Sequence, residues 1–280
     1  MNKIIIDKLN KYFNNDEINE LLNNLNNKQR SNIINNNYFA KIGNNSNKLF
    51  FNNLIKEIDL YKNNKNNNIP LIVDSYIDSN FCLLILKRIE GNTIGSNRNQ
   101  FNINLSKKKK LLIINNILNI KNLNVNLEID KKYNRKEKLE KYLSNTNKYI
   151  SKNTLNKITN NINEISKDTE NVISHGDLIP NNILLNNEQV YFIDWEYISY
   201  KPISYDLTYF LLFSKKYNSL DIIDSITLNF DKKDIYRDGI IICLKEINNW
   251  IKLIDKIDND IVEKNIKRWN RELNFILKKL

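Results

Sequence analysis

Hydrophobic and polar residues follow two different patterns along the chain, and the change falls near residue 91. Before that point, Asn-rich turns separate short apolar runs, which predicts strands over residues 31–34, 38–42, 69–78 and 81–89. Apolar residues at helical spacing predict two short helices within residues 2–26, broken near Asn14, and a longer helix over residues 50–61. These elements predict a small antiparallel sheet accompanied by helices.

The chain beyond residue 91 has a mainly helical pattern. Apolar residues recur at helical spacing in residues 106–122, 135–149, 152–166, 220–230, 235–257 and 261–280. Between the third and fourth of these segments, strands are expected over residues 183–185 and 190–193, with a turn at Asn186-Asn187. Residues 123–132 are expected to form a loop. The whole pattern predicts an α+β fold, and the length suits either one large domain or two lobes.

A group of polar residues surrounds the predicted hairpin. A short apolar run leads into His175-Gly176-Asp177, Asn182 follows that aspartate by five residues, and the second strand ends at Asp194. A hairpin brings the loop before its first strand close to the residue after its second strand. Asn182 and Asp194 are therefore expected to converge, with Asp177 nearby. Two oxygen ligands suit Mg²⁺, which takes few ligands from protein when phosphates supply the rest. The pattern predicts a phosphoryl-transfer site in which Asp177 accepts the proton of the attacking hydroxyl or orients that hydroxyl.

The two motifs resemble those of a known family. His175-Gly176-Asp177 with Asn182-Ile183-Leu184, followed by Ile193-Asp194-Trp195-Glu196-Tyr197, is similar to the aminoglycoside phosphotransferase/choline kinase family of small-molecule kinases. The second motif resembles the choline kinase and thiamine kinase branches more than the antibiotic kinases. The resemblance covers roughly residues 30–210. It implies a protein-kinase-like fold with a small N-terminal antiparallel-sheet lobe and a larger, mainly helical C-terminal lobe. It also implies ATP and Mg²⁺ as cofactors, with Asp177, Asn182 and Asp194 as catalytic residues and the last two as metal ligands.

A lysine and a glutamate upstream of the motifs have the placement of a phosphate-binding pair. Lys41 lies on the second predicted strand and Glu57 on the helix that follows it. In kinase folds a strand lysine holds the α- and β-phosphates and a helix carboxylate orients the lysine. The segment before this lysine, N-N-K-Q-R-S-N, contains no glycine. The phosphate contacts of a glycine-rich loop are therefore expected from Ser31, Asn32 or backbone N–H groups.

The strand over residues 81–89 runs into Lys87-Arg88-Ile89-Glu90-Gly91. This segment looks like the inter-lobe hinge of the family, which offers backbone N–H and C=O groups to adenine. The resemblance therefore implies a nucleotide-binding lobe over residues 1–91 and a catalytic and acceptor-binding lobe over residues 92–280. Lys87 and Ile89 are accordingly expected at the nucleotide. An ordinary strand that ends at a glycine turn is the alternative interpretation.

The acceptor is expected to be a small hydroxylated molecule and, by the resemblance, a cationic one such as choline or ethanolamine. A quaternary ammonium group favours aromatic faces and a carboxylate. The side chains available for these contacts are Asp177, Trp195, Glu196, Tyr197, Trp250 and Trp269. Trp250 and Trp269 also fit simple helix packing. Thiamine and aminoglycosides are amines with a free hydroxyl as well, and they stay alternatives.

Two further residues near the motifs are expected to support the loop. His175, the only histidine, is expected to pack and to hydrogen-bond the loop backbone and not to act as a base. Asp206 matches an Asp-Leu-Ala type motif of the family and is expected either to brace the catalytic loop or to act as an ordinary first-turn helix acid. Ser204 is expected at the N-cap of the helix that Asp206 opens.

Composition and charge disfavour several other classes of function. The chain has 280 residues and a net charge of +11, but its cations are scattered among Asn residues. The one tight run, residues 107–110, fits the solvated start of a helix, so no nucleic-acid partner is expected.

No apolar run is long enough for a signal peptide or a membrane span, and no membrane partner is expected. Cys82 and Cys243 lie far apart in apolar contexts, which indicates a reducing, cytoplasmic environment. The oligomeric state is left open.

Three other functions stay under consideration. A protein kinase is disfavoured because the glycine loop is missing and Asp206 follows Asp194 by only twelve residues, which leaves no room for an activation segment. A catalytically weak pseudokinase or binding module is suggested by the same missing glycines, although Asp177, Asn182 and Asp194 are all present. A nucleic-acid-binding protein is suggested by charge alone, and its binding would depend steeply on salt.

Overall fold

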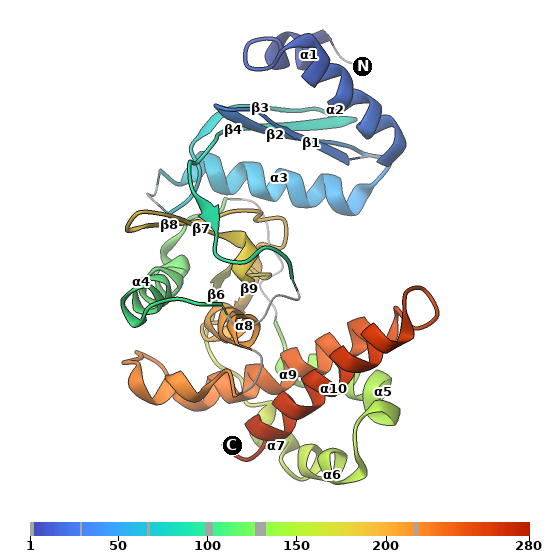
Figure 1. Ribbon diagram of the computed structural model, residues 1–280, viewed down its shortest axis with the longest axis vertical. Helices are drawn as coiled ribbons and strands as arrows, with labels where there is room; N and C mark the ends of the chain where they lie inside the picture. The colour runs from blue at the N-terminus through green and yellow to red at the C-terminus, as the bar shows by residue number, and fades with distance from the viewer. Residues whose placement is uncertain (1–2, 29, 66–67, 99–102, 127–132, 216–217) are drawn as a thin grey trace. The chain divides into compact units, whose positions relative to one another are not determined.

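The computed structural model describes residues 3–28, 30–65, 68–98, 103–126, 133–215 and 218–280 (Figure 1). The chain forms two compact units. The first contains Met1–Ile94, Asn122–Ile129 and Asn182–Ile198, and the second contains Gly95–Lys121, Asp130–Asn181 and Ser199–Leu280. The first unit thus extends three residues beyond Gly91 and includes the hairpin of the two motifs. The assignment of residues 1–91 and 92–280 to two lobes stays a prediction.

An antiparallel four-stranded sheet forms the centre of the first unit. Its spatial order is β1-β2-β4-β3, made of β1 Arg30–Ile34, β2 Tyr38–Asn44, β4 Phe81–Lys87 and β3 Ile72–Ile77. Helices α1 Lys3–Leu9 and α2 Asn15–Lys28 cover one face, and helix α3 Lys48–Asn63 covers the other (Figure 1). The core under α1 and α2 contains Ile5, Leu9, Leu21, Ile42 and Leu83, all fully buried. The strands, the turn after Ile77 and the break between the first two helices confirm the sequence predictions.

Helix α3 packs closely on the sheet because of one glycine. A Cβ atom on Gly43 of β2 would lie 2.7 Å from the ring of Phe50 in the first turn of α3. The helix begins after Asn47, whose side chain accepts a hydrogen bond from the backbone N–H of Phe50. The cap and the close approach together set which residues of α3 face the sheet.

The hairpin of the motifs also belongs to the first unit. Strands β7 Ile183–Asn186 and β8 Gln189–Phe192 pair with each other, and β7 also pairs with the short strand β5 Asn92–Thr93. Asn187 in the turn has a positive φ of 55°, which an asparagine tolerates. Asn68 attaches the hairpin to the chain before β3, because its carbonyl accepts from Phe192 N–H and its amide donates to the Val190 carbonyl. The hairpin predicted around residues 183–193 is confirmed.

The second unit is mainly helical. Its α-helices are α4 Lys107–Leu118, α5 Arg135–Thr146, α6 Lys152–Asn160, α7 Ile162–Ile165, α8 Tyr205–Ser214, α9 Lys232–Ile251 and α10 Asn259–Ile276. A two-stranded antiparallel sheet joins β6 Asn171–Ser174 to β9 Ser199–Pro202. Short 3-10 helices occur at Ile120–Asn122, Asn147–Tyr149, Pro180–Asn182 and Asp221–Ser225. The run 107–110 is the exposed first turn of α4 after the N-cap Ser106, as expected.

Helix α5 is anchored by a buried arginine. The Arg135 guanidinium, 1% exposed, donates to Asp234 at 2.7 Å and to Asp238 at 2.9 Å, both on α9. Ser204 also donates to Asp238, so its hydroxyl makes no cap bond to α8 although it occupies the N-cap position. A tertiary hydrogen bond has replaced the local cap that the sequence predicts.

Three helical predictions need correction. Residues 220–230 form one 3-10 helix, Asp221–Ser225, because Asp231 accepts from Lys233 N–H and starts α9 at Lys232. Residues 152–166 form two helices, since Asn161 caps the end of α6 through bonds to the carbonyls before it. The predicted helix over 235–257 ends at Ile251. Of the predicted loop 123–132, residues 127–132 lie outside the described residues.

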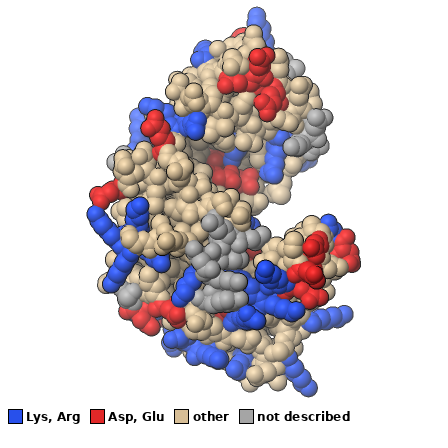
Figure 2. Space-filling model, in the orientation of Figure 1, with Lys and Arg blue, Asp and Glu red and all other residues tan. Residues whose placement is uncertain are grey.

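The surface and the cysteines bear on the predictions from composition. On the face seen in Figure 2, Lys and Arg form separate groups with Asp and Glu among them. Cys82 and Cys243 are buried free thiols. Within the described ranges, no helix is both long and apolar enough to cross a membrane. The expectation that no nucleic acid binds stays a prediction.

Candidate active site

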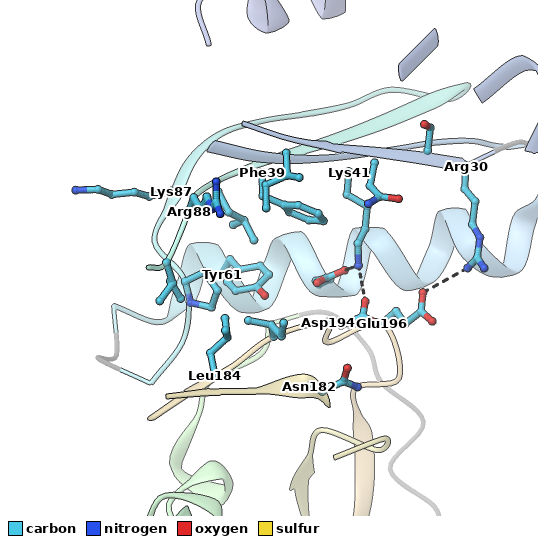
Figure 3. A pocket seen from close by; sticks show the side chains of 18 of the residues that line it. Arg30, Phe39, Lys41, Tyr61, Lys87, Arg88, Asn182, Leu184, Asp194 and Glu196 are labelled. Atoms are coloured by element: carbon cyan, nitrogen blue, oxygen red, sulfur yellow. Dashed lines mark hydrogen bonds and ion pairs between the residues drawn. The ribbon is translucent and has the colours of Figure 1, made fainter. Parts of the chain in front are cut away.

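A buried lysine lies between two carboxylates in the first unit. Lys41 is on the central strand β2, opposite Asn32 of β1 and Leu84 of β4. Its Nζ lies 2.9 Å from Glu57 Oε2 on α3 and 2.6 Å from Asp194 Oδ1 after β8 (Figure 3). Glu57 also accepts from the backbone N–H of Trp195 at 3.2 Å through its other oxygen. The pairing of Lys41 with Glu57 that the sequence predicts is thus present.

Burial and charge act against each other on this lysine and its partners. Burial alone would lower the pKa of Lys41, but Glu57 and Asp194 outweigh it and raise that pKa above its ordinary value. Burial raises the pKa of Glu57, and the neighbouring Lys41 ammonium partly offsets this effect. The ammonium therefore stays charged and is held at a fixed place on the sheet.

A cavity of about 600 Å³ opens beside Lys41. Its lining includes every residue that the sequence assigns to nucleotide or metal: Ser31, Asn32, Lys41, Glu57, Lys87, Ile89, Asn182 and Asp194. Apolar side chains from β2, β4 and the hairpin form one part of the wall: Phe39, Leu86 and Leu184. Figure 3 shows Phe39 and Leu184 among the residues that line this cavity. Cations form another part, contributed by Arg30, Lys41 and Arg88. An apolar wall beside cationic groups suits a ligand that joins a flat ring to an anionic group.

Asn182 and Asp194 meet at this cavity because of the hairpin. The backbone N–H of Ile193 donates to the Asn182 carbonyl at 3.0 Å, which brings the residue before β7 next to the residue after β8. Asp194 has a positive φ of 64°, and its side chain is 45% exposed. One amide and one carboxylate oxygen donor fit Mg²⁺, which needs only a few protein ligands when phosphates are present. The described residues contain no cluster of three His, Cys, Asp or Glu that would bind a metal unaided.

The loop that contains Asp177 belongs to the second unit and is held by α8. Asp206 accepts hydrogen bonds from Ser174 Oγ at 2.8 Å, from His175 N–H at 2.7 Å and from Gly176 N–H at 3.1 Å. His175 is fully buried, and its Nδ1 lies 3.4 Å from the backbone N of Asp177. Asp206 is therefore a brace of the loop, and His175 packs against the loop backbone as expected.

One arginine at this loop was not predicted from the sequence. Nη1 of Arg98 donates to both oxygens of Asp177, at 2.8 and 2.9 Å. Its Nη2 donates to Tyr209 Oη at 2.7 Å and to Glu246 Oε1 at 3.2 Å. The guanidinium also lies 5.1 Å from the centre of the Phe213 ring. Arg98 follows the polar run Gly95-Ser96-Asn97, where no motif or periodicity marks it.

The residues predicted to contact the acceptor molecule differ in their burial. Trp195 is fully buried, with its indole N–H bonded to the Phe192 carbonyl at 2.9 Å, and Trp269 is 1% exposed against Phe213. The prediction that these two side chains contact a substrate is wrong, because packing leaves them no accessible surface. Trp250 is 8% exposed, which agrees with its alternative interpretation as a packing residue.

Glu196 and Tyr197 remain accessible. Glu196 lines the 600 Å³ cavity, 3.8 Å from Arg30, and burial followed by the charge of Asp194 raises its pKa. Tyr197 is 51% exposed. Arg30 is a second residue of this site that sequence reasoning missed. It directly precedes the expected Ser31.

The chain resembles several solved structures over most of its length. An aminoglycoside 2′-phosphotransferase solved with GDP has a TM-score of 0.63 at 12% identity, covering 93% of this chain and 99% of its own. An aminoglycoside phosphotransferase solved with GDP and kanamycin has a TM-score of 0.62 at 15% identity, covering 88% and 90%. A choline/ethanolamine kinase family protein from Mesorhizobium loti has a TM-score of 0.63 at 10% identity, covering 89% and 85%. These likenesses show a protein-kinase-like fold.

The fold and the motifs define a class of protein, the small-molecule kinases. A sequence profile of choline/ethanolamine kinases matches residues 2–232, and the chain belongs to that family. No curated protein matches the chain by sequence. The resemblance noted from the motifs and the expected α+β kinase-like fold are both confirmed.

Proposed function

We propose that this kinase transfers the γ-phosphoryl group of ATP to a hydroxyl of a small molecule, with choline, ethanolamine or a related cationic alcohol as the first candidate. The observation that carries the proposal is the Lys41 ammonium held between Glu57 and Asp194 on the wall of the 600 Å³ cavity. A fixed, charged lysine next to Asn182 and Asp194 is the arrangement that kinase folds use to hold phosphates.

The nucleotide is assigned to the 600 Å³ cavity. Lys41 binds the α- and β-phosphates, and Ser31 and Asn32 replace the missing glycine loop. The backbone between Lys87 and Ile89 faces adenine, whose ring fits the apolar part of the lining. Two aminoglycoside phosphotransferases of this fold were solved with GDP, which supports a purine nucleotide as ligand.

Asn182 and Asp194 are the proposed ligands of Mg²⁺. These two side chains would hold the ion, which would supply positive charge against the charge that develops on the transferred group. Asp194 also bonds Lys41, so the same carboxylate orients the lysine and the ion.

Asp177 is the proposed acceptor of the hydroxyl proton. Its carboxylate can hold a hydroxyl in position and take its proton as the bond to phosphorus forms. In the structure Arg98 bonds both of its oxygens, so the acceptor must displace this guanidinium or share the carboxylate with it.

The contacts of Arg98 favour a cationic acceptor. Two carboxylates, Asp177 and Glu246, and two aromatic rings, Tyr209 and Phe213, surround this guanidinium. Carboxylates with aromatic faces are what an ammonium group seeks, and a cationic alcohol that displaces Arg98 would find them there. Glu196 and Tyr197 stay proposed contacts of the acceptor. An aminoglycoside is the second candidate because the chain shares its fold with aminoglycoside phosphotransferases, and thiamine is a third from the motif wording.

The test is ATP consumption with Mg²⁺ against choline, ethanolamine, thiamine and kanamycin. We expect turnover with one of these acceptors and a loss of at least about 10²-fold in kcat for Asp177→Asn. Lys41→Met is expected to raise the KM for ATP as well, whereas Lys252→Met, an exposed lysine after α9, serves as the matched control and should change neither. Equal turnover by wild type and Asp177→Asn would overturn the role of Asp177.

A further inference from the structure

A smaller cavity, of about 260 Å³, lies wholly within the second unit. It shares no lining residue with the 600 Å³ cavity. Four tyrosines, three lysines, one serine and two isoleucines line it: Tyr133, Tyr142, Tyr200, Tyr205, Lys138, Lys201, Lys245, Ser199, Ile241 and Ile242. No acidic residue is among them. All three lysines are half-buried, and Lys138 Nζ lies 3.6 Å from Glu137 Oε1. Partly buried charges are usually paired, so the partners of Lys201 and Lys245 decide what the cavity can bind.

Two of the lysines bond neutral oxygens and aromatic faces instead of carboxylates. Lys201 Nζ donates to the Gly176 carbonyl at 3.2 Å and lies 4.2 Å from the centre of the Tyr205 ring. Lys245 Nζ lies 3.3 Å from Tyr209 Oη and 3.5 Å from Tyr205 Oη. Among the residues that the structure describes, no carboxylate comes within ion-pair distance of either ammonium. Lys41, Arg98 and Arg135, in contrast, each bond two carboxylates.

The lack of a carboxylate within ion-pair distance disfavours the charged form of both lysines. Burial, followed by repulsion from Lys245, lowers the pKa of Lys201 to about 7, and burial lowers the pKa of Lys245. The two ammonium groups that face this cavity therefore lose their protons more readily than the ammonium group of a surface lysine does. Perturbed lysines of this kind cluster at functional sites more often than at structural ones. Asp206 and Asp177 attract Lys201, and Glu246 and Asp177 attract Lys245, but burial outweighs them. An anion in the cavity would add attraction at shorter range.

The other groups that line the cavity indicate the size and polarity of the rest of such an anion. Ser199 and the tyrosine hydroxyls offer donors to anionic oxygens, while the tyrosine rings and Ile241 offer apolar surface. The volume is below the usual range for drug-sized ligands, which starts near ~300 Å³. A quaternary ammonium compound is a poor fit, because Lys201 and Lys245 repel it. We propose that this cavity is a binding site for a small organic anion, a carboxylate or phosphate monoester on a compact, partly apolar body, held by Lys201 and Lys245.

The site lies next to the catalytic loop. Lys201 bonds the carbonyl of Gly176, the residue before Asp177, and Lys245 precedes Glu246, which bonds Arg98. An anion that draws Lys201 away from Gly176 would release a contact of the loop. Lys245 also lies 3.3 Å from Tyr209 Oη, so this cavity borders the residues around Arg98. It shares no lining residue with the 600 Å³ cavity, and its occupancy can be measured without turnover.

Isothermal calorimetry with phenyl phosphate and with benzoate tests the proposal, in the presence of saturating ADP so that the 600 Å³ cavity is filled. We expect at least one of the two anions to bind, with benzyl alcohol and benzyltrimethylammonium as neutral and cationic controls that do not. Tighter binding of phenyl phosphate identifies a phosphate monoester as the ligand type, and tighter binding of benzoate identifies a carboxylate.

Substitution of the lysines separates this site from other basic surfaces. Lys201→Met and Lys245→Met are each expected to weaken anion binding at least tenfold, whereas the exposed Lys252→Met should bind as the wild type does. Unchanged ADP binding reports that each variant is folded, and Lys→Gln variants replace any that is not. Equal anion binding by all variants, or binding of neither anion to the wild type, would overturn the proposal. Neither result depends on whether the protein phosphorylates choline.

Discussion

At the scale of single residues, two strand lysines of this protein show how environment decides the chemistry of one side chain. Lys41 is buried between two carboxylates, and its pKa is raised. Lys201 bonds a carbonyl and an aromatic face, and its pKa is lowered to about 7 because burial and Lys245 outweigh any attraction. The first is a fixed cation suited to phosphate. The second loses its proton near neutral pH unless an anion is present.

The lowered pKa of Lys201 predicts how stability depends on pH. Between about pH 7 and 10 the unfolded chain keeps a proton on this lysine that the folded protein has lost, so its contribution to stability rises with pH. Below about pH 7 both states are protonated and the full cost remains. Lys201→Met, which has no such proton, should be more stable than the wild type at pH 7. This advantage should shrink by about 1–3 kcal/mol at pH 10, after allowance for partial solvent exposure.

Urea unfolding of both proteins at pH 7, 8, 9 and 10 measures this difference, and the anion should be absent from the buffer. Other lysines and tyrosines titrate in the same range and are common to both proteins, so their contributions cancel apart from that of Lys245, which acts on Lys201 in the wild type alone. Parallel stability curves for the two proteins would contradict the prediction.

At the scale of elements, α8 is the part of the second unit that holds the loop containing Asp177. Its first turn supplies Asp206, which accepts three hydrogen bonds from residues 174–176 at the end of β6. The alternative from the sequence is an acid that only complements the helix dipole, which is worth about 0.3–1 kcal/mol. The observed contacts predict a larger effect, because each hydrogen bond to a charged group contributes about 1.5–3 kcal/mol.

Substitution of Asp206 by Asn distinguishes the two interpretations. The amide keeps the size but directs an NH₂ group at backbone N–H donors, so we expect the free energy of unfolding to fall by about 2–4 kcal/mol. The kcat should fall while the KM for ATP changes little, because the residue positions the Asp177 loop and not the nucleotide. Asp260→Asn is the matched control, since Asp260 is an exposed acid in the first turn of α10. A similar small loss in both variants would support the dipole interpretation alone.

At the scale of the whole molecule, the 600 Å³ and 260 Å³ cavities belong to different compact units. All lining residues of the 600 Å³ cavity belong to the first unit, and all those of the 260 Å³ cavity belong to the second. The first unit is discontinuous in sequence, because it takes the hairpin 182–198 from beyond the long helical region. The nucleotide and the proposed organic anion are therefore expected to stabilise different parts of the chain.

Hydrogen exchange detected by mass spectrometry tests this division. ADP with Mg²⁺ should slow exchange most in β2, α3 and the β7–β8 hairpin, because bound ligand suppresses local opening of the structure that binds it. Peptides from α6, α7 and α10 should change little. Protection of equal size throughout both units would contradict the assignment of the nucleotide to the first unit's cavity.

The fold class, most elements and the residues that line the 600 Å³ cavity could be predicted from the sequence. Period-two and helical patterns place strands and helices because one face of each must be buried, and they locate β1 to β4, α3 and the β7–β8 hairpin correctly. Element ends were less predictable. Asn161 and Asp231 end or begin helices through side-chain caps that an Asn-rich chain offers at many positions. Every predicted nucleotide residue lines one cavity because strand register and hairpin geometry follow from local sequence.

The sequence by itself determined the family, the α+β fold, the Lys41–Glu57 pair and the convergence of Asn182 with Asp194. These depend on short-range geometry and on motifs with regular spacing. Only the tertiary structure decided that Arg98 bonds Asp177, that Trp195 and Trp269 are buried, and that Lys201 and Lys245 share a cavity without a carboxylate. Each of these depends on contacts between residues far apart in the chain, and no local pattern encodes them. The charge and the burial of a side chain are properties of its three-dimensional neighbours, which is why the acceptor region was the part least predictable from sequence.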